Sequence, residues 1–277
     1  MNKDDLLLGK ETQYAFTYDN SLIFPIERTG NRGRLNMPVK KVHGELPFFG
    51  QDVWTGYELS WLNLKGKPQV AIAEFVIPAD STSIVESKSF KLYLNSFNNT
   101  RLESIEQVKT RLQQDLSAGF GAQIEVTLFA VDAFPLVNAK LGENIDDLDI
   151  EVKDFEPNAS LLQVNPAHLT SQTLNSHLLK SNCPVTGQPD WATLVVQYKG
   201  TEIDRASLLK YIISYRNHDD FHEHCVEQIF CDLCQAGEFE ELVVTARYTR
   251  RGGLDINPTR SLKPLMEDDV VGRLARQ

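Results

Sequence analysis

The sequence lacks the features that mark several large classes of protein. Its four cysteines in 277 residues are too few for a disulfide-stabilised scaffold. Lys and Arg number 28 against 38 Asp and Glu, and the net charge of −10 argues against a surface that neutralises nucleic-acid phosphates. No apolar run approaches the roughly 18–20 residues of a membrane-spanning helix. The first ten residues are partly acidic and unlike a signal peptide, so we expect a cytoplasmic protein that binds neither membrane nor nucleic acid.

Several common catalytic and cofactor motifs are also missing from the sequence. It has no Rossmann G-x-G-x-x-G after a strand, no P-loop, no H-E-x-x-H and no G-x-S-x-G. What remains is an ordinary globular composition, with 42% hydrophobic and 24% charged residues. The length fits one large domain or two small ones.

The strongest organisational feature is an internal repeat. Placing residues 86–127 on residues 204–245 without a gap aligns nine identical residues, among them Ser89 with Ser207. Identities spread over one ungapped alignment indicate a supersecondary unit that is used twice. The apolar patterns predict a strand, a helix and a second strand in each copy.

In the first copy, nearly alternating apolar residues predict a strand over 90–97. A capping box of Thr100 and Glu103 predicts the start of the helix, and Gly119 its end. The return strand is expected over 124–129.

In the second copy, we expect a strand over 208–215 and a return strand over 241–249. The helix between them has an apolar stripe of Phe221, Cys225, Ile229 and Leu233, and Gly237 ends it. Further strands are predicted over 56–64, 69–78 and 191–200.

These elements predict an α+β protein with antiparallel sheets and helices packed on one face. We expect an N-terminal module, 1–140, and a C-terminal module, 141–277. An acidic connector over 143–160 lies at the start of the second module.

One candidate for chemistry is the segment 181–192, in which Cys183 is followed at once by a proline. The thiol lies in a constrained loop before a strand, and Asp190 follows seven residues later. A thiolate can act as a nucleophile, and a nearby carboxylic acid can donate a proton to an atom that becomes basic. The alternative is a free cysteine in a turn.

A second candidate is the segment 218–234, rich in histidine, cysteine and acidic residues. Its cysteines invite a zinc interpretation, but Cys231 and Cys234 lie on one predicted helix and have no second cysteine pair as partner. We therefore expect no metal. His222 and Glu223 open the helix, where Glu223 either complements the helix dipole or accepts paired hydrogen bonds from a planar ligand edge.

Two polar segments complete the candidates. Glu86 to Ser89 concentrate charge and hydroxyl groups, which either form an exposed edge or hold a base and a phosphate. Arg250 and Arg251 precede two glycines in an acidic protein. That turn is either a solvated hairpin or a phosphate contact that lets a ligand approach the backbone.

Taken together, these segments resemble the NADPH-dependent 7-cyano-7-deazaguanine reductases, the nitrile reductases of queuosine biosynthesis. The similar stretches are VESKSFKLYLNSF from Val85, NCPVTGQPDW from Asn182, the pair His222-Glu223 and RRGG from Arg250. The arrangement matches the long, two-module form of that family, with the hallmark motif in the first module and the cysteine in the second. The resemblance implies tandem tunnelling-fold modules and a homodimer that uses no metal.

The resemblance also implies a role for each matching residue. Cys183 is expected to add to the nitrile of 7-cyano-7-deazaguanine (preQ0) as a covalent thioimide, with Asp190 as proton donor. Two NADPH then reduce the adduct to the aminomethyl product. The substrate-binding residues are expected to be Val85, Glu86, Ser87, His222 and Glu223. The cofactor-binding residues are expected to be Ser87, Lys88, Arg251 and Gly252, with Arg250 as an alternative contact.

Two other functions are consistent with parts of the pattern. One is a cysteine- or zinc-dependent hydrolase of a purine- or pterin-like heterocycle. The other is a non-catalytic binding protein of the same fold, which the presence of both Cys183 and Asp190 in one loop disfavours. Cys225, Cys231 and Cys234 belong to none of the motifs and are either packing residues or oxidation-prone neighbours of the reactive thiol.

Overall fold

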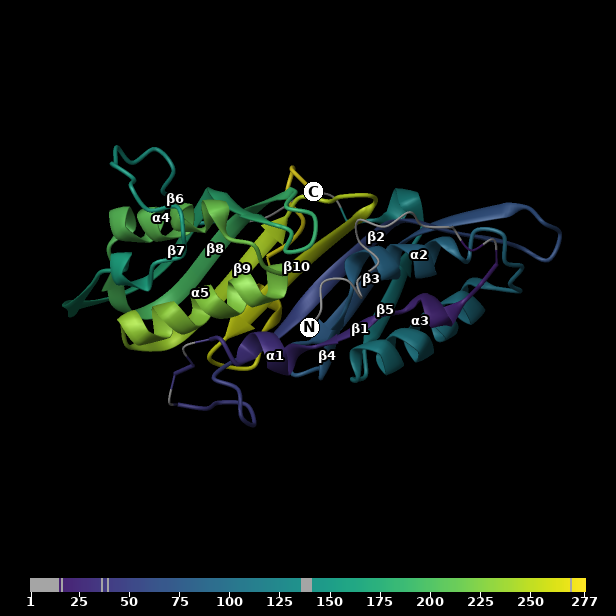
Figure 1. The fold of residues 1–277 in the computed structure, drawn as a ribbon, viewed down its shortest axis with the longest axis horizontal. Helices are drawn as coiled ribbons and strands as arrows, with labels where there is room; N and C mark the ends of the chain where they lie inside the picture. The colour runs from purple at the N-terminus through teal and green to yellow at the C-terminus, as the bar shows by residue number, and fades with distance from the viewer. Residues whose placement is uncertain (1–14, 16, 36, 39, 136–140, 270) are drawn as a thin grey trace. The chain divides into compact units, whose positions relative to one another are not determined.

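A computed structural model describes residues 15, 17–35, 37–38, 40–135, 141–269 and 271–277. They fall into two compact units, and each is described by itself (Figure 1). The first draws its residues from Met1–Gly33, Asp52–Leu136 and Arg250–Ile256, and the second from Arg34–Gln51, Val137–Thr249 and Asn257–Gln277. The ten N-terminal residues behind the signal-peptide prediction lie outside the described residues. No helix in the described ranges is long and apolar enough to cross a membrane.

The first unit is a sheet with two helices on one face. Its strands lie in the order β5-β3-β2, with the pair β3 and β5 antiparallel. The side chain of Trp54 on β2 packs against Phe90 of α2 and Phe120 of α3, so both helices cover the same face. The bounds are β2 (Phe49–Leu62), β3 (Pro68–Pro78), β5 (Glu125–Phe129), α2 (Ser87–Asn95) and α3 (Ile105–Phe120). A small antiparallel pair, β1 (Pro25–Glu27) with β4 (Ser83–Val85), and helix α1 (Arg28–Arg32) complete the unit.

The second unit is a sheet in the order β10-β9-β8-β7-β6, antiparallel except for the parallel contact of β6 with β7. Helices α4 and α5 pack against it (Figure 1). The bounds are β6 (Glu143–Asn144), β7 (Val164–Asn182), β8 (Pro189–Ile203), β9 (Phe239–Tyr248), β10 (Leu254–Ser261), α4 (Arg205–Ser214) and α5 (His222–Ala236). Short 3-10 helices occupy Asn20–Leu22, Val131–Ala133, Ala159–Leu161, Tyr215–Asn217 and Glu267–Asp269. The predicted α+β class with antiparallel sheets is confirmed.

The internal repeat is visible in the hydrogen bonds of the two units. Glu86 caps α2 by accepting from Ser89 N (2.7 Å), and Asp204 caps α4 by accepting from Ser207 N (2.8 Å). The Ser89 hydroxyl donates to Glu86 O, and the Ser207 hydroxyl donates to Asp204 O, both at 2.8 Å. The same construction therefore starts the first helix of each repeat copy, α2 and α4.

Buried tyrosines repeat the correspondence one turn later. Tyr93 on α2 donates to Asp115 on α3, and Tyr211 on α4 donates to Asp232 on α5, each at 2.6 Å. In each copy of the repeat, a tyrosine–carboxylate bond thus joins the two helices. The repeated use of one supersecondary unit, predicted from the sequence, is confirmed.

The first predicted strand of each copy is wrong, because residues 90–97 and 208–215 fall mainly in α2 and α4. The buried residues Phe90, Tyr93, Leu94 and Phe97 are spaced by three, four and seven positions, which suits one face of a helix. Glu86 at the N-cap satisfies two backbone N–H groups and so settles the local choice in favour of helix.

The predicted ends of α3 are also wrong. Its N-cap is Ser104, four residues after Thr100, and the Ser104 hydroxyl accepts from Gln107 N at 3.2 Å. The helix ends at Gly121, which takes the left-handed conformation at φ 66°, whereas Gly119 lies inside the helix. A Cβ on Gly119 would come within 2.6 Å of the Ile23 side chain, so close packing requires that glycine. The predicted strands over 69–78, 124–129, 191–200 and 241–249 and the helix ending at Gly237 are confirmed within a few residues. The strand predicted over 56–64 is also present, but it starts seven residues earlier, at Phe49.

Candidate active site

The loop that carries Cys183 closes the hairpin between β7 and β8. Strand pairing ends at Asn182 with Pro189, and Cys183 N then donates to Gln188 O at 2.9 Å. Gly187 N donates back to Cys183 O at 2.9 Å, and Gly187 takes a φ of 66° that favours glycine. Only 6% of Cys183 is exposed. The predicted constraint on this thiol is therefore confirmed, and it comes from main-chain bonds on both sides.

Asp190 lies at the base of the hairpin that carries Cys183. It pairs with Ser181 across β7 and β8, and the loop begins after the next pair, Asn182 with Pro189. Asp190 is 5% exposed. A buried carboxyl group therefore lies next to the loop that holds the thiol.

Asn182 ties this hairpin to the start of α5. Its N–H donates to His218 O (2.8 Å), its C=O accepts from Asp220 N (3.1 Å), and its amide donates to Asp219 Oδ1 (3.0 Å). The residue before the thiol is therefore bonded to the chain that leads into the helix. This contact positions His222 and Glu223, the first two residues of α5, beside the hairpin.

His222 and Glu223 are both turned inward. His222 Nε2 lies 3.3 Å from Asp190 Oδ2, and its ring stacks on Tyr248 of β9. Glu223 is 3% exposed in the first turn of α5, where the helix dipole favours an ionised carboxylate. The structure thus brings His222 into contact with Asp190, and it places Cys183 in the loop next to Asp190 and Glu223 next to His222 in the first turn of α5.

Asp220 explains part of the acidic run before the helix. Its carboxylate accepts from Phe221 N at 2.8 Å, is hydrogen bonded to His224 Nδ1, and lies 3.5 Å from His218 Nε2. Burial raises the pKa of Asp220, but the bonds from His218 and His224 lower it by more, so its pKa lies well below the usual range. Asp220 is therefore an anchor for the helix start, a role that the sequence did not reveal.

The three cysteines on α5 are packing residues with protonated thiols. Burial raises the pKa of Cys225 well above its usual value, raises that of Cys231, and raises that of Cys234 to about 12. Of the three cysteines, Cys225 lies nearest to the predicted site residues. Ser181 and the Tyr248 hydroxyl both act on the pKa of its thiol. The structure describes no group of three or more His, Cys, Asp or Glu side chains arranged to hold a metal.

In the first unit, Glu86 serves the backbone at the start of α2. Its two carboxylate oxygens accept from Lys88 N at 3.0 Å and from Ser89 N at 2.7 Å. Burial raises the pKa of Glu86, and these two bonds oppose the change. Val85, the last residue of β4, is buried, and Ser87 is the first residue of α2. These predicted residues therefore lie at a helix start, where the sequence analysis expected a strand.

Positive side chains gather beside the turn that precedes β10. Arg251 N donates to Leu254 O, and Gly252 and Gly253 take φ angles of 56° and 71°. A Cβ on Gly252 would lie 3.4 Å from Lys91 Nζ, so the Lys91 side chain covers the glycine backbone. The turn at residues 250–253 is confirmed. Lys91 adds a positive charge beside it that the sequence analysis did not predict.

Helical spacing explains why Lys91 belongs with the predicted cofactor residues. Lys88 and Lys91 are three residues apart on α2 and share one face. The guanidinium of Arg250 lies 4.5 Å from the centre of the Tyr57 ring, which fixes the other side of the turn. Lys91 lies beside the arginine turn, and Lys88 lies one turn earlier on the same helix, so this part of the first unit carries several cations that suit a phosphate. Lys91 was missed because residues 90–97 were read as a strand.

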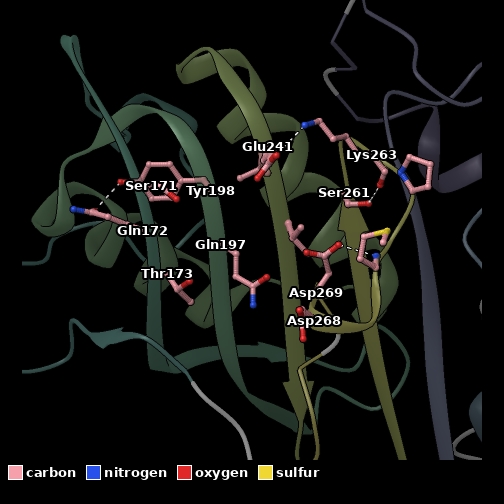
Figure 2. A pocket seen from close by; sticks show the side chains of 14 residues that line it. Ser171, Gln172, Thr173, Gln197, Tyr198, Glu241, Ser261, Lys263, Asp268 and Asp269 are labelled. Atoms are coloured by element: carbon pink, nitrogen blue, oxygen red, sulfur yellow. Dashed lines mark hydrogen bonds and ion pairs between the residues drawn. The ribbon is translucent and has the colours of Figure 1, made fainter.

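A separate groove of about 680 Å³ lies in the second unit and includes none of the predicted site residues. Its wall includes Gln197 and Val243, which pair across β8 and β9 (Figure 2). By strand alternation these residues point to the face opposite Asp190 and Tyr248. The groove is therefore distinct from the candidate active site.

Comparison with known proteins decides the family. Residues 14–128 match the family described as nitrile reductase, 7-cyano-7-deazaguanine-reductase N-term, and residues 189–265 match the QueF-like protein family. A relative from Bordetella avium is 53% identical over 263 residues, covering 94% of each chain. The chain belongs to the 7-cyano-7-deazaguanine reductase family.

Other family members are similar over an even larger share of the chain. A relative from Hydrogenovibrio crunogenus is 52% identical, covering 99% of this chain and 97% of its own. One from Teredinibacter turnerae is 50% identical, covering 99% and 98%. All three relatives carry the name NADPH-dependent 7-cyano-7-deazaguanine reductase. The family resemblance inferred from the sequence motifs is therefore confirmed.

Proposed function

We propose that this protein reduces the nitrile of 7-cyano-7-deazaguanine to 7-aminomethyl-7-deazaguanine with two NADPH, in queuosine biosynthesis. The observation that carries the proposal is the buried Cys183 thiol, held at a hairpin end with Asp190 at the base of the same hairpin, in a member of this family. The hydrolase alternative has no support among the relatives, whose names describe reductases.

Cys183 opens the reaction by adding its sulfur to the nitrile carbon. A carbon–sulfur bond forms, one π bond of the C≡N group breaks, and a proton reaches the nitrogen to give a thioimide. Asp190 supplies that proton, because negative charge develops on the nitrogen as the sulfur adds. His222, 3.3 Å from Asp190, returns a proton to the carboxylate.

NADPH supplies two hydrides, which account for the four-electron reduction. After the first hydride and a proton reach the C=N group, the carbon is tetrahedral and still bonded to Cys183. The sulfur then leaves as a thiol and an imine forms, which takes the second hydride and another proton to give the amine. Cys183 is thus regenerated, and Asp190 is positioned to provide the protons at the nitrogen.

The substrate offers a ring N–H and an exocyclic NH₂ on one edge. The Glu223 carboxylate accepts both, as a planar acceptor with two oxygens. A base without this donor pair leaves a buried carboxylate without its ligand and is rejected. We assign His222, Val85, Glu86 and Ser87 to the remaining substrate contacts.

The positively charged residues of the first unit are suited to bind the phosphate groups of NADPH. Lys88 and Arg251 provide positive charge, Gly252 provides backbone without a side chain, and Ser87 provides a hydroxyl group. Lys91 covers Gly252 and adds a further cation to the same face of α2. This set favours a cofactor with an additional phosphate group.

Four wider assignments accompany this function. We propose that residues 1–140 and 141–277 are tandem tunnelling-fold modules and that the protein is a homodimer. We also propose that it acts in the cytoplasm on a small molecule and binds no nucleic acid. Light scattering tests the dimer, and a gel-shift assay with tRNA at physiological salt tests the last point. A monomer or a specific tRNA complex contradicts the corresponding assignment.

The activity is tested by mixing the protein with NADPH and 7-cyano-7-deazaguanine. We expect two NADPH to be oxidised per amine formed, and a covalent adduct on the intact protein by mass spectrometry when NADPH is omitted. Cys183→Ala should abolish both, whereas Cys234→Ala, which changes a thiol elsewhere on α5, should retain both. Turnover without NADPH, or full activity of Cys183→Ala, contradicts the proposal.

A further inference from the structure

A parallel aromatic stack lies behind the His222 imidazole. The rings of His222 and Tyr248 have centroids 3.6 Å apart and planes that differ by 4°. Tyr248 is the last residue of β9 and pairs with Ala192, which lies two positions after Asp190 on β8. Tyr248 and Asp190 therefore project from the same face of the sheet towards the first turn of α5.

The backbone of Tyr248 is held by two buried amide side chains. Its N–H donates to Asn257 Oδ1 at 3.1 Å, and its C=O accepts from Gln277 Nε2 at 3.1 Å. Gln277 Nε2 also contacts Asn257 Oδ1 at 2.6 Å, which joins the two supports. Tyr248 is completely buried, so its ring is a fixed platform and not a mobile surface group.

The stack supports a residue at the very start of a helix, because His222 is the first residue of α5. A histidine side chain has two rotatable bonds, and a stacked face fixes the plane of the ring. With the plane fixed, Nε2 lies 3.3 Å from Asp190 Oδ2. The hydroxyl of Tyr248 lies at the edge of the ring, near Ser181 and Cys225, whereas the stack uses the ring face.

We propose that Tyr248 is a positioning residue that holds His222 in the orientation that serves Asp190 during proton delivery. This inference rests on the proposed function, since it assigns the proton chemistry to Asp190 and His222. Tyr248 acts through the face of its ring, and its hydroxyl group is dispensable for this role.

The test compares Tyr248→Phe, which keeps the ring, with Tyr248→Leu, which removes the stack and keeps an apolar side chain. We expect Tyr248→Phe to retain kcat within about twofold, and Tyr248→Leu to lower kcat by about 10- to 100-fold with a smaller change in KM for the nitrile, as expected for a misplaced catalytic group. Tyr198→Leu, at another buried tyrosine of the same sheet, is the matched control and should leave kcat within about threefold.

A double-mutant cycle separates positioning from a general structural effect. If Tyr248 acts through His222, then Tyr248→Leu lowers kcat by less than about twofold when His222→Asn is already present. Equal losses in both backgrounds overturn the proposal, as does full kcat in Tyr248→Leu. Should Tyr248→Leu fail to fold by thermal denaturation, Tyr248→Met replaces it, with the same expected result and the same refuting result.

A measurement without turnover keeps this proposal separate from the proposed function. The ¹⁵N resonances of the His222 imidazole, assigned by comparison with His222→Asn, report the ring environment in the unliganded protein. They should match the wild type in Tyr248→Phe and move in Tyr248→Leu. If the wild type is inactive but the resonances follow this pattern, the reductase assignment is rejected and the stack is retained. If the resonances do not move in Tyr248→Leu, the stack itself is rejected.

Discussion

Asp220 allows a quantitative test of how the start of α5 is held. Asp220→Asn keeps the shape of the side chain but replaces a carboxylate by an amide, which cannot accept from Phe221 N, His224 and His218 together. A hydrogen bond to a buried charged group contributes about 1.5–3 kcal/mol. We expect the first turn of α5 to lose about 2 kcal/mol of stability towards local opening, which is roughly a 30-fold faster hydrogen exchange.

The assay is hydrogen–deuterium exchange at neutral pH, resolved to peptides that contain residues 222–226. Asp219→Asn is the neighbouring control, because Asp219 is exposed and accepts only from the Asn182 amide among its described contacts. It should change exchange by less than about threefold, in keeping with a surface substitution. Identical exchange in Asp220→Asn and the wild type refutes the reasoning.

The same residue predicts a pH dependence with a definite sign. The pKa of Asp220 in the folded protein is lowered from 3.8, so its carboxylate stabilises the folded state above that pH. The stabilisation declines as pH falls below about 4 towards the folded-state pKa, because the unfolded chain then binds the proton more readily. The difference between wild type and Asp220→Asn should therefore be largest at neutral pH and shrink in acid. A difference that grows in acid contradicts this assignment.

Two further predictions concern ligands. Lys91→Ala should raise KM for NADPH by about tenfold through loss of one phosphate contact, with kcat little changed, whereas Lys65→Ala on an exposed loop should leave KM unchanged; equal KM values in the two variants count against this phosphate contact. Glu223→Gln should weaken nitrile-substrate binding by about 30- to 100-fold in calorimetry, because the amide can accept only one of the two donated hydrogen bonds, whereas exposed Glu238→Gln should bind as the wild type does. Unchanged affinity in Glu223→Gln removes that residue from the substrate site.

The sequence predicted the strands well where they carry continuous apolar runs. Along β8, for example, the buried residues Leu194 and Val196 belong to a long β-branched and apolar run that suits a strand. It missed β7 and β10, which have no such run. It failed for α2, because Phe90, Leu92 and Leu94 alternate as in a strand, whereas Phe90, Tyr93 and Leu94 have helical spacing, in a segment of only nine residues. The deciding interaction was the Glu86 cap, whereas the sequence analysis interpreted that carboxylate as part of an exposed edge or as a ligand contact.

The candidate site was predictable only in part, because some of its residues are positioned by their neighbours in the sequence and others by distant parts of the fold. The Cys183 loop is fixed locally by Pro184 and Gly187, so the sequence identified it. The proposed role of Tyr248 depends on the stacking of its ring on His222. Tyr248 lies on β9 and His222 on α5, and no spacing along the chain predicts that contact. Lys91 could have been found from its spacing to Lys88, given the correct helix.

The repeated helix start separates what the fold needs from what a ligand needs. Asp204 caps α4 with a side chain one methylene shorter than that of Glu86, and the surrounding bonds are alike: Asp204 N donates to Gln163 O as Glu86 N donates to Phe24 O. The extra length of Glu86 is therefore no requirement of helix capping. In a duplicated scaffold, the copy without a proposed ligand role thus shows how much of the other copy's side chain the architecture alone requires.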